Sequence, residues 1–148
     1  MGLIHSHEKN VIHRDIKPQN VIVDLTSYQA KLIDFGLSLW VNPTTSKKAY
    51  KRCGTMGYMA YEVIKNSSEN RKVYDQKCDV FSFGIIAHMM LLEKNPLKGK
   101  TYEETAAKNS ECKIVLDKDD IMKKYGNSCF EFLKGMLEID PSKRWSAE

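Results

Sequence analysis

Two short polar segments near the start of the chain carry the residue types that phosphate chemistry requires. Residues 13–20 read His-Arg-Asp-Ile-Lys-Pro-Gln-Asn, and residues 34–36 read Asp-Phe-Gly. Their carboxylates and amide offer the oxygen ligands that a hard cation such as Mg²⁺ prefers. A lysine beside them would neutralise a phosphate, and a free carboxylate could orient a hydroxyl nucleophile. The two segments therefore indicate phosphoryl chemistry assisted by a divalent cation.

Short strands are expected to hold both segments in place. Apolar runs at residues 11–12, 21–23 and 30–33 are separated by polar clusters, and the two later runs are predicted to form a hairpin through residues 24–29. Residues 39–51 are polar and show neither a helical nor a strand period. We expect a long mobile loop there.

Helical patterns dominate the rest of the chain. Residues 79–92 are apolar almost all round and begin with an acid, which is typical of a helix at the centre of a core. Residues 129–137 place apolar side chains at helical spacing before Asp140-Pro141 ends the segment. The polar stretch 94–128 is expected to contain loops with one or two short helices. The sequence predicts a mainly α-helical domain with small β-hairpins near its N-terminus.

Composition excludes several classes of protein. The 148 residues, 42% of them hydrophobic, suffice for one globular domain, and a net charge of +4 is too small to predict a nucleic-acid partner. The longest apolar run, residues 83–92, is shorter than the roughly 20 residues that a membrane helix needs. The four cysteines lack C-x-x-C spacing and are expected to be reduced thiols of a cytoplasmic protein, with the nucleus as the alternative location. The first six residues also fit, loosely, the pattern for N-myristoylation of Gly2.

Residues 13–20 and 34–36 resemble the catalytic loop and the metal-binding motif of eukaryotic protein kinases. The resemblance implies a kinase-like large lobe, ATP and Mg²⁺ as cofactors, and a protein substrate with a serine or threonine hydroxyl. A lysine two residues after the catalytic aspartate is the pattern of serine/threonine-directed members. By this resemblance, Asp15 would orient the hydroxyl of the substrate or accept its proton, and Lys17 would neutralise the γ-phosphoryl group. Asn20 and Asp34 would bind Mg²⁺ and the nucleotide. Phe35 and Gly36 would have a structural or switching role.

Residues 54–62, which read Gly-Thr-Met-Gly-Tyr-Met-Ala-Tyr-Glu, resemble the end of a kinase activation segment. Tyr61 stands where the family usually has proline. The change removes a preset backbone φ, and we expect it to be tolerated. By the same resemblance, Thr55 would hydrogen-bond Asp15 and Lys17 in the active arrangement.

The resemblance also implies structural roles for residues outside these motifs. Glu62 would pair with Arg144 of the segment 140–144, and a buried bidentate pair of this kind is costly to break on one side. The alternative for this pair is two solvated charges. Three further contacts are implied: Asp79 would accept backbone amides of the catalytic loop, His13 would stack with Phe35, and Ile22 would form the floor of the adenine pocket.

Regulation is expected to act on the activation segment, residues 34–62. Arg14, beside the catalytic aspartate, resembles the residue that receives a loop phosphate, and an upstream activating kinase would supply that phosphate. The alternative is a solvated basic linker. The candidate acceptors are Thr44, Thr45, Ser46 and Tyr50.

The resemblance covers residues 1–148 as the large lobe of a partial kinase domain, with residues 93–148 as its C-terminal helical part. The 148 residues contain neither the family's glycine-rich loop nor its strand lysine. We therefore expect weak or no activity from this chain alone, and exposed apolar surface where the small lobe would pack. Two functions stay open: the catalytic region of a serine/threonine kinase, or a truncated non-catalytic interaction module. The acids, amide and lysine together favour the first, because a scaffold has no chemical need for them.

Overall fold

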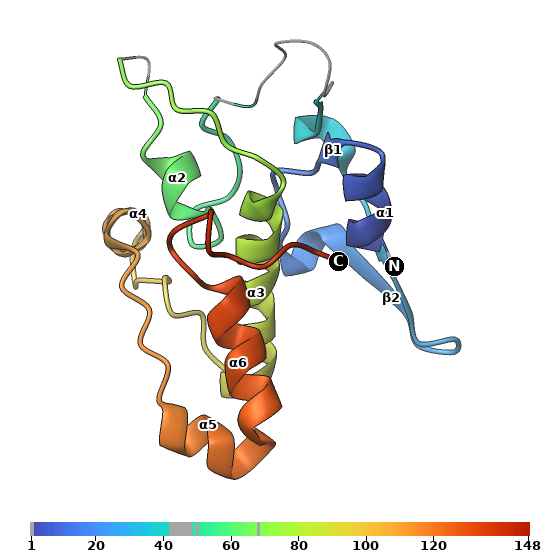
Figure 1. The fold of residues 1–148 in the computed structure, drawn as a ribbon, viewed down its shortest axis with the longest axis vertical. Helices are drawn as coiled ribbons and strands as arrows, with labels where there is room; N and C mark the ends of the chain where they lie inside the picture. The colour runs from blue at the N-terminus through green and yellow to red at the C-terminus, as the bar shows by residue number, and fades with distance from the viewer. Residues whose placement is uncertain (1, 42–48, 50, 68) are drawn as a thin grey trace.

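The computed structural model describes residues 2–41, 49, 51–67 and 69–148, and it shows helices arranged around a long central helix beside two small antiparallel sheets (Figure 1). This confirms the predicted mainly helical fold with small hairpins. The N-terminal part contains α1 (Gly2–Glu8), β1 (Val11–Ile12), β2 (Val21–Asp24), β3 (Gln29–Leu32) and β4 (Leu39–Trp40). The later part contains α2 (Tyr61–Ile64), α3 (Lys77–Leu92), α4 (Tyr102–Glu111), α5 (Lys118–Tyr125) and α6 (Asn127–Met136).

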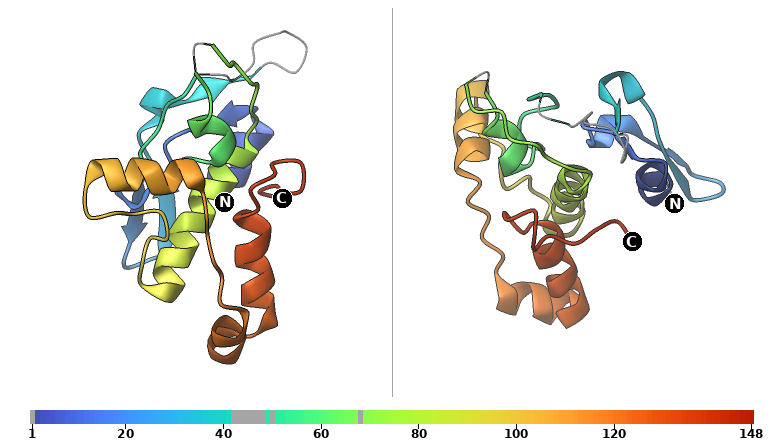
Figure 2. Two further views of the ribbon diagram at one scale, coloured as in Figure 1. Left: turned by 90° about the vertical axis from the view of Figure 1, so that its left-hand side faces the viewer. Right: turned by 45° about the horizontal axis from the view of Figure 1, so that its top comes forward.

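The predicted hairpin is present as β2 and β3, which pair antiparallel from Val21 opposite Leu32 to Asp24 opposite Gln29. At its tip, the Asp24 carboxylate accepts the backbone N–H of Thr26 at 2.8 Å, which favours a tight turn. The hairpin and α1 lie on one side of α3, and α4 lies on the opposite side (Figure 2).

The second sheet corrects one expectation. Residues 39–40, predicted as the start of a loop, form β4, which pairs antiparallel with β1. A two-residue strand has no detectable period of its own, and this one forms because β1, nearly 30 residues earlier in the chain, offers it a partner. The pairing anchors the chain directly after residues 35–37.

Helix α3 is the centre of the fold. It runs for 16 residues, begins two residues before the predicted start at Asp79, and ends at the predicted residue, Leu92. Phe81 and Ile85 are fully buried, as expected for a helix that is apolar on most sides. Helix α6 packs against it closely at Gly84, because a Cβ there would lie 2.9 Å from the side chain of Leu137. The absence of that Cβ sets the close approach of the two helices.

Two clusters of buried side chains surround α3. One includes Ile12, Phe81 and Ile85 and joins the β1–β4 sheet to the central helix, and the other includes Ile121 and Leu133 and joins α5 and α6 to the same helix. The four cysteines are free thiols, in line with the expectation from their spacing. The core therefore rests on apolar packing.

The two helices that lie wholly within residues 94–128 start at side-chain caps. Thr101 accepts the N–H of Glu104 at 3.2 Å at the start of α4, and Asp117 accepts the N–H of Asp120 at 3.0 Å at the start of α5. The expectation of one or two short helices in this stretch is confirmed. Among the described residues, no helix is long and apolar enough to cross a membrane.

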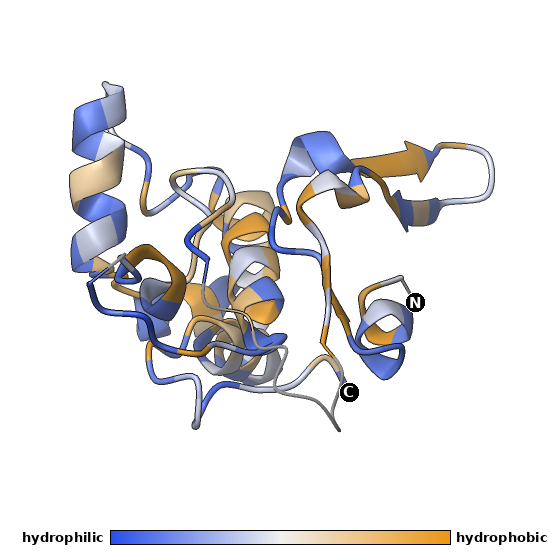
Figure 3. Cartoon of the chain, turned by 90° about the horizontal axis from the view of Figure 1, so that it is seen from above, coloured by the Kyte–Doolittle hydropathy of each residue, from blue (hydrophilic) through white to orange (hydrophobic). Residues whose placement is uncertain are grey.

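Large apolar side chains are exposed on the hairpin. Ile22 is 54% exposed, and Val23 and Leu25 are also open to solvent. The hairpin extends away from the helices, with hydrophobic residues along β2 (Figure 3). This exposed apolar surface agrees with the expectation from the sequence.

Candidate active site

Four polar side chains meet at one point in the structure. Thr55 donates from Oγ1 to Asp15 Oδ1 at 2.6 Å, while Lys17 Nζ lies 2.8 Å from Asp15 Oδ2 and donates to Thr55 Oγ1 at 2.9 Å. The short 3-10 helix at residues 18–20 turns Asn20 back toward the same carboxylate. The Asn20 amide donates to Asp15 Oδ2 at 3.2 Å and to the Asp15 backbone carbonyl at 2.8 Å.

The environment of Asp15 keeps its carboxyl ionised. The residue is 8% exposed, and burial alone would favour the neutral acid. Hydrogen bonds from Lys17, Thr55 and Asn20, together with the positive charge of Lys17, outweigh burial and hold the pKa of Asp15 below its ordinary value. At neutral pH Asp15 is therefore a charged hydrogen-bond acceptor.

The first turn of α3 holds the loop that carries Asp15. Asp79 accepts the backbone N–H groups of His13 and Arg14, each at 2.8 Å, through its two carboxylate oxygens. Arg14 has a left-handed backbone with φ of 68°, a conformation that costs energy for a residue with a side chain. These two bonds offset that cost and fix the loop directly before Asp15.

A buried histidine supports the same carboxylate. The His7 Nε2 atom lies 3.0 Å from Asp79 Oδ2, and both side chains are almost fully buried. Sequence reasoning missed His7, because its partner lies 72 residues later and the position on α1 carries no local signal. The contact ties α1 to α3 beneath the loop.

The expected contact of His13 with Phe35 is present, edge to face, with ring centroids 4.7 Å apart. His13 is fully buried, and its Nε2 lies 2.9 Å from the backbone carbonyl of Ile33. This histidine packs and hydrogen-bonds between two segments of the site. Ile22, expected beneath an adenine ring, lies on β2 with its side chain open to solvent.

Asp34 lies at the start of the short 3-10 helix at residues 35–37. Its backbone is left-handed with φ of 59°, and its Oδ1 accepts the N–H of Gly36 at 3.2 Å. The residue before it, Ile33, donates its backbone N–H to the carbonyl of Asn20 at 3.0 Å. The chain thus brings the Asp34 segment beside the Asn20 segment.

Asn20 and Asp34 carry amide and carboxylate oxygens, the ligand types that Mg²⁺ prefers. Both amide bonds of Asn20 go out from its nitrogen, so its Oδ1 stays available in the described part of the chain. The described residues contain no group of three or more His, Cys, Asp or Glu that could hold a metal ion by themselves. Mg²⁺ does not need one, since it usually keeps several waters and binds one or two carboxylates plus substrate phosphates.

Arg14, the expected receiver of a loop phosphate, bonds to nearby oxygen atoms. Its Nε donates to the Leu37 carbonyl at 2.6 Å, and its two Nη atoms lie 3.5 Å from the Tyr74 hydroxyl and the Ser38 carbonyl. Burial raises the pKa of Tyr74 well above its ordinary value, so the hydroxyl stays protonated. The candidate acceptors Thr44, Thr45, Ser46 and Tyr50 lie outside the described residues.

The expected pair of Glu62 and Arg144 is present and bidentate. Arg144 Nη1 and Nη2 donate to the two carboxylate oxygens of Glu62 at 2.6 and 3.0 Å. The guanidinium lies over the ring of Phe81, 5.0 Å from its centroid. The pair therefore connects the end of the segment 54–62 to α3 and to the C-terminal part of the chain.

Two asparagines that sequence reasoning missed hold the residues after Thr55. Asn109, fully buried on α4, accepts the N–H of Gly57 at 2.7 Å and donates to the carbonyl of Met59 at 2.8 Å. Asn95 donates to the carbonyl of Gly57 at 3.1 Å.

Comparison with known proteins places this chain in a family. The model of the protein kinase domain matches residues 1–148. A serine/threonine-protein kinase of Arabidopsis thaliana, AtPK1/AtPK6, is 35% identical over 143 residues, which cover 95% of this chain and 27% of that protein. An Aurora kinase of Patiria pectinifera is 33% identical over 147 residues, which cover 99% of this chain and 33% of that protein.

A third relative gives the same result. The serine/threonine-protein kinase cds1 of Schizosaccharomyces pombe is 32% identical over 152 residues, which cover 97% of this chain and 31% of the relative. The chain thus spans about a third, or less, of the length of these three relatives.

Proposed function

Because the chain belongs to the protein kinase family, we propose that it forms the large-lobe part of a serine/threonine protein kinase, with Mg²⁺-ATP as the phosphoryl donor and a protein hydroxyl as the acceptor. The observation that supports this most directly is the cluster of Asp15, Lys17 and Thr55. A lysine and a threonine hydroxyl both contact one ionised carboxylate, and both of these residues line an open groove.

In this proposal Asp15 orients the acceptor hydroxyl. A carboxylate with a lowered pKa is a weak base, so it suits the acceptance of a hydrogen bond from the hydroxyl better than early removal of its proton. Thr55 and Asn20 hold the carboxylate from two sides, which keeps its free lone pairs in one direction. Positioning of this kind supplies much of the rate in phosphoryl transfer.

Lys17 has a second task, because its ammonium group can contact both Asp15 and the transferred phosphoryl group. A lysine carries three donor hydrogens, and here two are used, on Asp15 and Thr55. Asn20 and Asp34 would hold Mg²⁺, which, when bound, neutralises charge on the nucleotide phosphates.

The test combines nucleotide binding with transfer. We expect Mg²⁺-ATP to raise the melting temperature of the wild-type chain and of Asp119→Asn, an exposed control on α5, and to leave Asp34→Asn unshifted. With radiolabelled ATP, we expect slow transfer to serine peptides and none to tyrosine peptides, lost in Asp15→Asn. Equal shifts for wild type and Asp34→Asn, with no transfer, would refute the proposal and favour the non-catalytic interaction module.

A further inference from the structure

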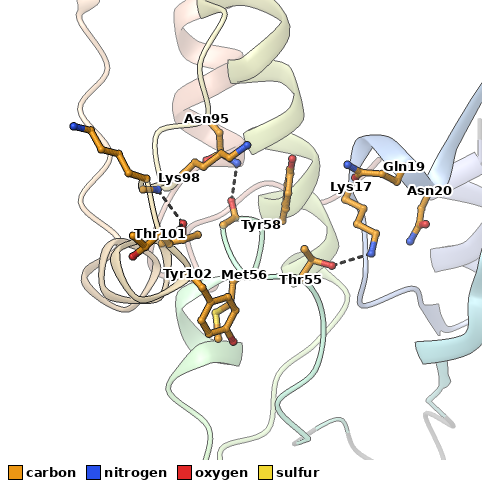
Figure 4. Close-up of a pocket in the computed structure, with 14 residues that line it drawn as sticks. Lys17, Gln19, Asn20, Thr55, Met56, Tyr58, Asn95, Lys98, Thr101 and Tyr102 are labelled. Carbon is orange, nitrogen blue, oxygen red and sulfur yellow. Dashed lines mark hydrogen bonds between the residues drawn. The ribbon is translucent and has the colours of Figure 1, made fainter.

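An open groove of about 690 Å³ begins at the candidate active site and runs toward the start of α4. Lys17, Gln19 and Asn20 lie at one end, Thr55 and Tyr58 lie in the middle, and Asn95, Lys98, Thr101 and Tyr102 lie at the far end (Figure 4). A substrate segment that presents its hydroxyl to Asp15 would therefore extend along this groove.

The groove is positively charged. Lys17, Lys98 and Lys100 line it, and the described residues that line it include no aspartate or glutamate. Lys98 and Lys100 are exposed, and neither makes an ion pair within the described part of the chain. Lys17 is committed to Asp15, so the two outer lysines supply the uncompensated charge.

A neighbouring hollow of about 560 Å³ extends the same charge. It shares Lys98 and Lys100 with the groove and adds Lys94 and Lys108. Its acids are Glu93 and Glu104. The Glu104 carboxylate already accepts the backbone N–H of Lys100 at 2.7 Å. Among the described lining residues, lysines outnumber acidic residues in both hollows.

The loop that carries these lysines is tied down. Gly99 donates its N–H to the Thr105 hydroxyl at 2.9 Å, and a Cβ at Gly99 would lie 2.3 Å from the Cβ of Glu104. Asn95, at the start of the loop, bonds to Gly57 across the groove. The backbone that carries Lys98 and Lys100 is therefore held in a defined place relative to Thr55.

We propose that this groove selects acceptor segments in which aspartate or glutamate residues flank the serine or threonine. The proposal rests on the proposed function, since the groove is identified by its position beside Asp15. Complementary charge steers association and suppresses wrong partners, here peptides with basic flanks. Lysines offer separate point charges, whereas a single phosphate is commonly clamped by the bidentate fork of arginine, and the described lining contains no arginine. The groove therefore suits several carboxylates better than one phosphorylated residue.

The test uses fluorescent serine peptides of one length whose flanking residues are glutamate, glutamine or lysine, and a fourth with one phosphoserine among glutamines. Binding to the chain is measured by fluorescence anisotropy at two salt concentrations. The double variant Lys98→Gln/Lys100→Gln removes the groove charge. The variant Lys72→Gln/Lys123→Gln removes the same charge from exposed positions elsewhere. Melting curves show that each variant folds.

We expect the glutamate peptide to bind about tenfold more tightly than the glutamine peptide, as two exposed ion pairs allow, and more weakly at high salt. The preference should disappear in Lys98→Gln/Lys100→Gln and persist in the control. Equal binding of the three unphosphorylated peptides, tightest binding of the lysine or phosphoserine peptide, or an unchanged preference in the groove variant would overturn the proposal.

Transfer from radiolabelled ATP to the same peptides separates the two proposals. Selective binding of the glutamate peptide without transfer to any peptide would count against the kinase activity and leave the charge selection standing. Transfer at equal rates to all peptides would overturn the charge selection and leave the kinase activity standing. The absence of both binding and transfer would overturn both proposals.

Discussion

Replacement of Arg144 by alanine tests the connection between the segment 54–62 and the core. The guanidinium is fully buried and donates to both oxygens of Glu62 and to the backbone carbonyls of Lys77, Glu138 and Ile139. Its loss leaves a largely buried carboxylate unpaired and three carbonyls without this donor. Removal of one partner from a buried ion pair costs about 3–5 kcal/mol, a large part of the roughly 5–15 kcal/mol that stabilises a domain.

Lys143→Ala is the matched control. Lys143 lies 3.9 Å from Asp140, and its side chain is 74% exposed, so its removal should cost less than about 0.5 kcal/mol. Urea unfolding followed by circular dichroism gives both values, and a midpoint that falls without a change in slope shows lost stability. In thermal melts, Arg144→Ala should lower the midpoint by about 10 °C.

A second substitution tests whether the unpaired charge of Glu62 causes the loss of stability. If the unpaired charge is the main cost, Glu62→Gln in the Arg144→Ala background should restore part of the stability, whereas Glu62→Gln alone should reduce it. Equal small losses for Arg144→Ala and Lys143→Ala, or no recovery in the double variant, would show that this pair does not hold the segment.

Two further outcomes are expected. Thr55→Val should raise the pKa of Asp15 toward its ordinary value, measured by carbonyl NMR titration, because one hydrogen bond to the charged form is lost. Because the pKa of Asp15 is lower in the folded than in the unfolded chain, its ionisation stabilises the fold above the unfolded-state pKa, and this stabilisation is lost as pH falls through the folded-state pKa. Thr55→Val should weaken this loss of stability in acid. An unchanged pKa of Asp15 in the variant would contradict the contact. Gly84→Ala should lower the free energy of unfolding in urea by about 1–3 kcal/mol, because its Cβ would press on Leu137. The control Gly2→Ala, whose Cβ would make ordinary contacts, should be nearly neutral. Equal effects of the two substitutions would argue against close packing of α3 and α6.

Much of the fold could be predicted because the signals are local. The all-apolar run at 79–92 gave α3 to within two residues, and the spacing at 129–137 gave most of α6. The helix begins two residues before the predicted start, because Lys77 and Cys78 precede Asp79 in the helix and neither carries a start signal. Strand β4 was missed because only its pairing with β1 defines it.

The motifs of the site could be predicted from the sequence, but the residues that hold those motifs in place could not. The contacts of Thr55 with Asp15 and Lys17 agree with what the kinase resemblance implied. His7 and Asn109 could not be found in that way, because their partners lie 50 or more residues away and each acts through hydrogen bonds inside the fold. A polar side chain with a distant partner leaves no periodic trace in the sequence.

The carboxylate of Asp79 has a consequence for the local opening of the chain. Its bonds to the N–H groups of His13 and Arg14 make the catalytic loop part of the same cooperative unit as the first turn of α3. The amide hydrogens of His13 and Arg14 are therefore expected to exchange with solvent at rates that follow the opening of this turn, whereas the exposed β2–β3 hairpin can open by itself. Two amides outside regular secondary structure thus share the protection of the first turn of the central helix.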